Sequence, residues 1–206
     1  MIEGSNDIIK LNKNKLKKAA MIFSRAFQSG PIYMQFIPDD EKRRKDLHIL
    51  FEGFVCYSFK YGKIYATSEN LEGIMAILPS ETSNITTWRM LRCGAWKYPL
   101  KFGLKFIEQG KQIDEISSTI HRRIAPDPHV YLWLLGVDPS KQGKGFGSKL
   151  LRYLLNDCKK KNLPCYLETG KKANLSFYEH FGFEVMEEYH FKDMNLTLWG
   201  LLWNKK

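Results

Sequence analysis

The sequence predicts a mixed α/β (α+β) fold: a central mixed, twisted sheet of about six to seven strands, flanked by helices, with a helical insertion before the central strand. Three observations predict it. Residues 130–137 form an almost unbroken apolar run, typical of a strand buried on both faces. A glycine-rich turn and a segment of helical periodicity follow that run directly. Apolar residues also recur every three or four positions elsewhere, which indicates amphipathic helices around the sheet.

In the first third of the chain, the pattern of apolar residues predicts one short strand, over residues 7–11, and two helices. The first helix has one apolar face, and Gly30 with Pro31 ends it. A linker over 31–39 leads to the acidic residues 39–41, which favour a helix N-terminus because of the helix dipole. The second helix then runs to Gly62.

Two strands, residues 64–67 and 73–78, follow this helix pair and are joined by a polar turn. Residues 83–125 show no strand pattern, and their apolar spacing predicts two or three helices broken near Pro99. These helices form the insertion. Its aromatic side chains either fill the core or line a ligand pocket.

After the central strand, the pattern predicts a helix over about 145–162, a strand over 164–168 and two closing strands over 183–190 and 195–203. Between them, Asn174 is expected to cap a helix that contains Phe177, Tyr178 and Phe181. A chain of 206 residues is long enough for one buried core, so we expect a single domain over 1–206.

Composition excludes several classes of protein. The N-terminus lacks the basic and then apolar order of a secretory signal, and the apolar stretch 194–203 is about half the length that spans a bilayer. Four cysteines without a Cys-x-x-Cys pair and five scattered histidines indicate free thiols, a cytoplasmic protein and no metal. The net charge of +10 is spread along the chain, so a nucleic-acid partner is not expected.

The turn from Gln142 to Ser148 carries three glycines, at 143, 145 and 147. Such a turn directs unpaired backbone N–H groups, reinforced by the helix dipole, toward a place where a phosphate can bind. The spacing of a P-loop is absent, and Ser148 stands where a dinucleotide-binding loop has its third glycine. The turn therefore predicts a phosphate site of a different type, the alternative being a tight turn without a ligand.

Two segments resemble the GCN5-related N-acetyltransferase (GNAT) superfamily. Gln142, Gly145 and Gly147 match its Gln/Arg-x-x-Gly-x-Gly/Ala loop, and residues 167–183 (LETGKKANLSFYEHFGF) are similar to a segment of the subgroup around puromycin N-acetyltransferase. The resemblance is close over residues 130–185 and weaker over 31–39. It implies the GNAT fold, with an acetyl-CoA-binding core at about 129–190. The chain departs from the subgroup at Gly30, where relatives often have an acidic residue, so an acceptor-binding carboxylate is not expected there.

The resemblance also implies roles for the site residues. The loop would hold the pyrophosphate of acetyl-CoA, and the helix after Asn174 would flank the CoA arm. Independently of the resemblance, a strand that splays at Gly136 would offer peptide N–H groups near residues 135–137 to the thioester oxygen and the pantetheine arm. The expected cofactor-binding residues are Leu135, Gly136, Val137, Gln142, Gly143, Lys144, Gly145, Phe146, Gly147, Ser148, Asn174 and Phe177.

Two side chains are candidate catalytic residues, and each has a structural alternative. The resemblance implies that Tyr178 protonates the departing thiolate; the alternative is that it only packs a helix on the sheet. Glu168, at the end of a neighbouring strand, would deprotonate the ammonium, directly or through water. Its alternative is a structural carboxylate that satisfies backbone donors.

We therefore expect an acetyl-CoA-dependent N-acetyltransferase that acts on a primary amine of a small molecule and uses no metal. Two alternatives stay open: a protein or peptide N-acetyltransferase, and a non-catalytic acyl-CoA-binding regulatory module. Acceptor selectivity should reside before residue 126, with Phe27, Tyr33 and Trp96 as candidate wall residues. We expect a monomer or homodimer, with no nucleic-acid and no membrane partner.

Overall fold

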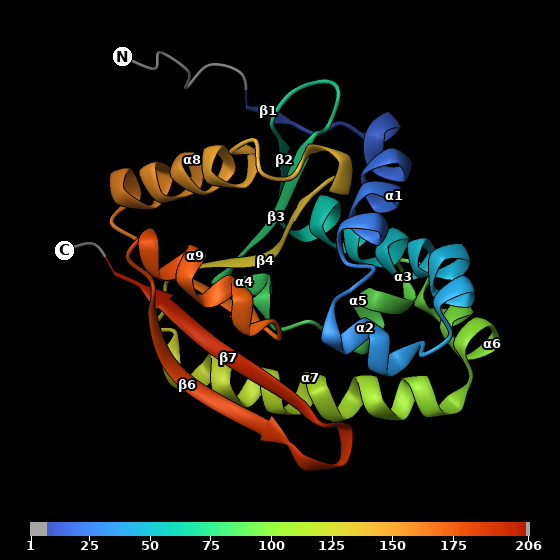
Figure 1. Cartoon of the computed structure of the whole chain (residues 1–206). Coiled ribbons are helices and arrows are strands. Elements are labelled where there is room, and N and C mark those ends of the chain that lie inside the picture. The colour runs from blue at the N-terminus through green and yellow to red at the C-terminus, as the bar shows by residue number, and fades with distance from the viewer. Residues whose placement is uncertain (1–7, 205–206) are drawn as a thin grey trace.

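The computed structural model describes residues 8–204, which form a seven-stranded sheet with helices on both faces (Figure 1). The strand order is β1-β2-β3-β4-β5-β7-β6, and of these neighbours only β4 and β5 are parallel. The strands are β1 (Ile9–Lys10), β2 (Lys63–Ala66), β3 (Gly73–Pro79), β4 (Val130–Val137), β5 (Cys165–Thr169), β6 (Glu184–Phe191) and β7 (Leu196–Trp203). The predicted mixed sheet is confirmed, and residue 7 of the expected first strand lies outside the described residues.

The helices surround the sheet on its two faces. They are α1 (Leu16–Ala26), α2 (Pro31–Phe36), α3 (Asp40–Tyr61), α4 (Ser80–Ser83), α5 (Thr87–Leu91), α6 (Tyr98–Phe102), α7 (Leu104–Ile124), α8 (Phe146–Lys161) and α9 (Leu175–His180). The apolar faces of α8 and α9 pack on one face of the sheet, and those of α1 and α3 pack on the other. Helix α7 runs alongside β6 and β7 (Figure 1). None of the described helices combines the length and hydropathy needed to span a bilayer.

The central strand β4 is buried at one end and open at the other. It pairs with β5 only from Val130 to Leu132, so the two strands separate after Leu132 and not at Gly136 as expected. Trp133, Leu135 and Val137 are therefore partly exposed, although the whole strand was expected to be buried. Gly136 has another function: a Cβ there would lie 2.9 Å from the ring of Phe23, so glycine lets α1 pack against the strand.

The segment after α1 is helical and not a linker. Helix α1 ends at Ala26, and Gly30 and Pro31 begin α2. Proline is well tolerated at the first helical position, because the N–H that it lacks has no partner inside the helix there. The predicted acidic start of α3 is confirmed, since the side chain of Asp39 accepts a hydrogen bond from the backbone N–H of Lys42 at 2.8 Å.

The insertion is helical as predicted, but its breaks lie elsewhere. Pro99 falls in the first turn of α6, where it is compatible with the helix. The breaks lie at Gly94 and Gly103, whose φ angles of 92° and 86° belong to the left-handed region. The long helix α7 begins only after the second glycine.

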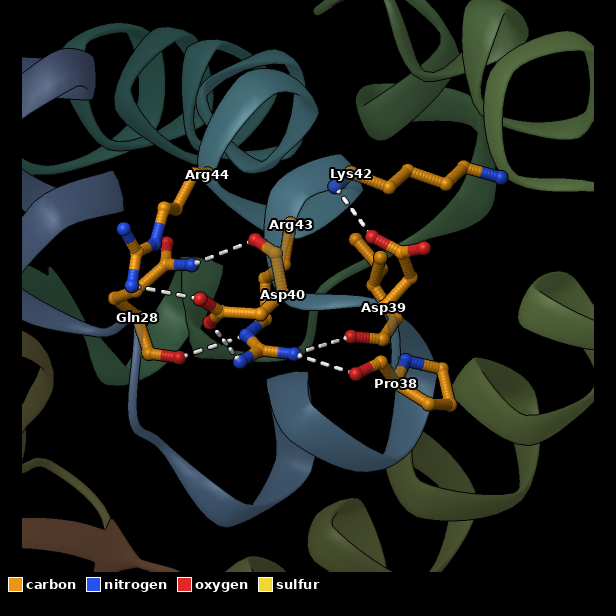
Figure 2. Close-up of polar contacts among 8 residues, drawn as sticks. Gln28, Pro38, Asp39, Asp40, Lys42, Arg43 and Arg44 are labelled. Carbon is orange, nitrogen blue, oxygen red and sulfur yellow. Dashed lines mark hydrogen bonds and ion pairs between the residues drawn. The ribbon is translucent and has the colours of Figure 1, made fainter.

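Arg43 joins the ends of the first three helices (Figure 2). Its buried guanidinium donates to the carbonyl oxygen of Gln28 at 2.8 Å, to that of Ile37 at 2.6 Å and to that of Pro38 at 3.1 Å. It also pairs with Asp40 at 2.7 Å. A buried guanidinium can satisfy several carbonyl groups at once, so Arg43 fixes α2 between α1 and α3.

Candidate active site

A cavity of about 940 Å³ lies where β4 and β5 separate. Its walls come from α1, α2, α3, the insertion, β4, β5, the glycine loop and α9. All the expected cofactor-binding residues line it except Lys144, which is exposed. The open strand pair is thus the structural origin of the cavity, because the peptide and side-chain groups of β4 beyond Leu132 have no neighbouring strand on that side.

The glycine loop is shaped as an anion site at one end of this cavity. Gly143 and Gly145 have φ angles of 76° and 79°, and no atom lies within 4 Å of where their Cβ would be. Gly145 is the N-cap of α8 and no side chain caps the helix, so its first N–H groups are available to a ligand. Gln142 steadies the loop by donating to the carbonyl oxygen of Val137 at 3.3 Å.

Asp138 ties the start of the loop to α1. Its carboxylate forms an ion pair with Arg25 and accepts from the backbone N–H of Ser140 at 3.1 Å. The hydrogen bond from Arg25 is the main reason why the pKa of Asp138 is lowered. The turn that precedes the anion site is therefore held by charge as well as by backbone geometry.

Glu168 lies at the centre of a hydroxyl cluster on the cavity wall. Its carboxylate accepts from Ser117 at 2.7 and 2.6 Å, from Tyr166 at 2.8 Å and from Tyr131 at 3.1 Å. Burial raises the pKa of Glu168, and the hydroxyl donors oppose that rise. The expected backbone donors are replaced by side-chain hydroxyls, and no cation pairs with this carboxylate among the described residues. A carboxylate in this setting can accept a proton from an ammonium group.

The insertion supplies a second carboxylate that the sequence reasoning missed. Asp114 lies on the cavity wall one turn before Ser117 on α7, and desolvation raises its pKa. Its charge also contributes to the raised pKa of Glu168. The i, i+3 spacing of Asp114 and Ser117 beside the apolar stripe of α7 was the available signal, but the pattern alone could not say which strand the helix would face.

Tyr178 projects into the same cavity from α9. Its ring is buried against Phe177 and Phe183, at centroid distances of 5.2 and 5.8 Å. Its hydroxyl makes no hydrogen bond to another residue within 8–204. Burial raises the pKa of Tyr178 above its ordinary value, so the phenol stays protonated at neutral pH and can donate.

Asn174 lines the cavity but does not cap α9 as expected. It occupies the N-cap position with helical backbone angles, and its side chain makes no capping hydrogen bond. Its amide instead donates to the hydroxyl of Thr169 at 3.3 Å, which links the start of α9 to the end of β5. The cap is lost because Asn174 already belongs to a 3-10 turn, where its side chain does not face the first helical N–H groups.

The wall of the cavity formed by the end of α1, α2, α3 and the insertion is aromatic. Phe27 and Tyr33 line it, as expected, and meet edge to face at 5.7 Å. Trp96 does not line it, and its side chain is 58% exposed. Further aromatic residues of this chamber are Phe36, Phe54, Tyr98, Phe106 and Trp133.

The histidines and cysteines within residues 8–204 form no group that could hold a metal ion. His121 and His129 are buried with their Nε2 atoms 2.8 Å apart. His129 directs Nδ1 to the carbonyl oxygen of Pro126 at 2.9 Å, which uses its second nitrogen. The four cysteines are free thiols, as expected.

Part of this chain is similar to a known family of acetyltransferases. Residues 96–183 match the model of the Acetyltransferase (GNAT) family. An uncharacterized N-acetyltransferase of Schizosaccharomyces pombe is 29% identical over 176 residues, which cover 81% of this chain and 70% of that protein.

Two solved structures share the fold over almost the whole chain. The crystal structure of "histone acetyltransferase HPA2 and related acetyltransferase" from Corynebacterium glutamicum has a TM-score of 0.69 and 18% identity, and covers 97% of this chain and 96% of that one. A mosquito arylalkylamine N-acetyltransferase-like protein has a TM-score of 0.60 and 12% identity, with coverage of 96% and 99%. These similarities establish a common fold and not a common substrate.

Proposed function

We propose that this chain is an acetyl-CoA-dependent N-acetyltransferase whose acceptor is the primary amine of a small molecule with an apolar body. One observation carries the proposal: a single cavity joins the uncapped glycine loop, the Tyr178 hydroxyl, the Glu168 carboxylate and an aromatic chamber. Acetyl-CoA would supply the thioester acetyl group. The GNAT family match and the S. pombe relative support this type of reaction.

Different residues of the cavity would have different roles in the acetyl transfer. The N–H groups of residues 143–148 would bind the pyrophosphate, and the open end of β4 would position the acyl arm. Glu168 would take the proton from the acceptor ammonium, so that the nitrogen lone pair can attack the acyl carbon. As the C–N bond forms and the C–S bond breaks, Tyr178 would give its proton to the thiolate, and the second proton that the nitrogen loses on becoming an amide would return to the Tyr178 phenolate through water.

The proposed acceptor class follows from two groups of residues on the cavity wall. Glu168 and Asp114 place negative charge near the reacting position, which favours a cationic amine. The aromatic residues that line the same cavity favour a hydrophobic or aromatic body. The name of the mosquito relative fits this class. The name of the C. glutamicum relative points to a protein substrate, which stays the second candidate.

Release of the CoA thiol in the presence of acetyl-CoA and a panel of amines tests the proposal. We expect arylalkylamines and alkylamines to give the highest kcat/KM, because burial of an apolar body contributes about 25 cal/mol per Å². Lysine-containing peptides of equal charge should react more slowly. Faster turnover of the peptides would favour a protein substrate, and no turnover of any amine despite tight acetyl-CoA binding would favour a binding module.

A further inference from the structure

The outer side of the insertion exposes large apolar side chains within one short segment. Trp88, Trp96, Leu100 and Leu104 are 67%, 58%, 83% and 79% exposed, and Leu91 is 39% exposed. Trp88 and Trp96 are also the only two exposed tryptophans within residues 8–204. Because water-exposed tryptophan and leucine are rarely grouped on a protein that has no partner for them, this grouping needs an explanation.

The same segment is cationic. The sequence has five basic residues and no acidic residue between Glu81 and Glu108. Arg92, Lys97 and Lys105 are exposed and form no ion pair with the described residues, whereas Lys101 pairs with the buried Asp46 at 2.9 Å. We call Trp88, Leu91, Arg92, Trp96, Lys97, Leu100, Leu104 and Lys105 the outer surface of the insertion.

Apolar and cationic groups alternate along this surface at helical spacing. Trp96 and Leu100 are four residues apart, as are Lys97 and Lys101, so each pair lies on one side of the turn and helix over 95–102. Tyr98 lies on the opposite side and is buried. Its hydroxyl donates a hydrogen bond to the carbonyl oxygen of Leu50 at 2.9 Å. The cations also lie beside the indoles: the guanidinium of Arg92 is 5.8 Å from the ring of Trp88, and the ammonium of Lys97 is 5.6 Å from the ring of Trp96.

We propose that the outer surface of the insertion docks on an anionic lipid membrane. Indole rings and leucine side chains enter the boundary between headgroups and acyl chains, while Lys and Arg stay with the headgroup phosphates. This surface has both components side by side. The expectation of no membrane partner came from the lack of a spanning segment, but peripheral docking needs none.

Two other occupants fit this surface less well. A second copy of the chain would place cations against cations, which is unfavourable without an acidic partner. A nucleic acid would suit the cations and indoles, but two leucines about four-fifths exposed offer nothing to a phosphate backbone and little to a base. An anionic lipid surface uses all the exposed groups.

Co-sedimentation of the full chain with vesicles tests the proposal. We expect binding to mixed phosphatidylcholine–phosphatidylserine vesicles that weakens with added salt, and much weaker binding to phosphatidylcholine alone. Combined Arg92→Glu, Lys97→Glu and Lys105→Glu should weaken it about tenfold or more. The matched control, Lys13→Glu with Lys17→Glu and Lys18→Glu, makes the same change of net charge at exposed lysines outside the insertion and should bind as the wild type does.

The apolar part has its own pair of variants. Leu100→Ser with Leu104→Ser should weaken vesicle binding about tenfold, whereas Met21→Ser with Met186→Ser, also exposed, should not. Trp88 and Trp96 remain as fluorescent reporters, and their emission should shift to shorter wavelength on anionic vesicles. Unchanged melting temperature and acetyl-CoA affinity would show that each variant is folded.

Three results would overturn the proposal. If the charge reversal left vesicle binding unchanged, the outer surface of the insertion would not be the part of the protein that contacts the lipid. RNA binding that depends on the same residues, without vesicle binding, would assign the surface to nucleic acid. A dimer in size-exclusion chromatography that Leu100→Ser with Leu104→Ser dissociates, again without vesicle binding, would assign it to a second copy.

Discussion

The hydroxyl of Ser117, on the insertion helix α7, lies 2.6 Å from Oε2 of Glu168, on β5 and 51 residues further along the chain. The insertion therefore contributes directly to the electrostatics of the candidate base. Burial raises the pKa of Glu168, and each hydroxyl donor lowers it. The balance between these effects sets the pH above which Glu168 can accept a proton from an amine.

Ser117→Ala should move the acidic limb of the kcat/KM profile to higher pH. Without this donor, less opposes the effect of burial on the pKa of Glu168, so this pKa rises. The ionised carboxylate that accepts the proton then forms only at higher pH. A hydrogen bond to a charged group is worth about 1.5 kcal/mol or more, so the limb should move by about one pH unit. Ser118→Ala is the matched control. A limb that stays in place in Ser117→Ala but disappears in Glu168→Gln would mean that Tyr131 and Tyr166 alone set this pKa.

Tyr178→Phe separates an enzyme from a binding module. The change keeps the ring packing against Phe177 and Phe183 but removes the hydroxyl. We expect kcat to fall by roughly ten- to a thousandfold, with little change in acetyl-CoA affinity. Tyr189→Phe, on the exposed edge strand β6, should behave as the wild type. Wild-type turnover by Tyr178→Phe from pH 6 to 9 would mean that solvent protonates the thiolate.

Gly145→Asp should weaken acetyl-CoA binding, because a carboxylate and a Cβ would face the pyrophosphate at the start of α8. Loss of one or more charge-assisted hydrogen bonds predicts about tenfold weaker binding, measured by calorimetry. Gly103→Asp is a strict control: its φ of 86° is close to the 79° of Gly145, and its surroundings are equally open. Equal affinities in the two folded variants would show that the loop does not bind the pyrophosphate.

Arg43→Met should destabilise the fold by about 3 kcal/mol or more in urea denaturation. It removes the donor shared by the carbonyl groups of Gln28, Ile37 and Pro38 (Figure 2). Arg44→Met loses an ion pair with the same Asp40, but its side chain is 72% exposed, so the cost should be at most about 0.5 kcal/mol. Similar losses for both variants would mean that α2 is held by apolar packing alone.

His121→Phe should flatten the dependence of stability on acidic pH. Burial, followed by the charge of His129, lowers the pKa of His121 from 6.5 to about 3. The unfolded chain therefore binds a proton between these values that the folded chain does not, and stability falls as the pH drops from 6.5 toward 3, by up to about 1.4 kcal/mol per unit. His180→Phe, which removes an exposed histidine, is the control. A slope unchanged by His121→Phe would mean that carboxylates account for all of the acid sensitivity.

The sequence by itself determined the features that depend on neighbouring residues. The uninterrupted apolar run fixed β4 to Val130–Val137, and the acidic cluster placed the start of α3, because burial pattern and N-capping act over a few positions. The glycine loop could likewise be placed before α8, since only glycine readily adopts the φ angles found at 143 and 145.

Only the tertiary structure decided which distant residues contact these elements. The separation of β4 from β5 comes from pairing that stops at Leu132, and no local pattern marks that residue. The hydroxyl donors around Glu168 come from three elements, and Asp114 joins the site only because α7 packs beside β7. Trp96 illustrates the same limit: its aromatic ring suggested a cavity wall, but Gly94 and Gly103 turn the helix so that Tyr98 is buried and Trp96 faces outward. Neighbouring residues determine where the helices and strands of this protein form. Which of them pack together depends on contacts between distant residues, because those contacts form only when the whole sheet is assembled.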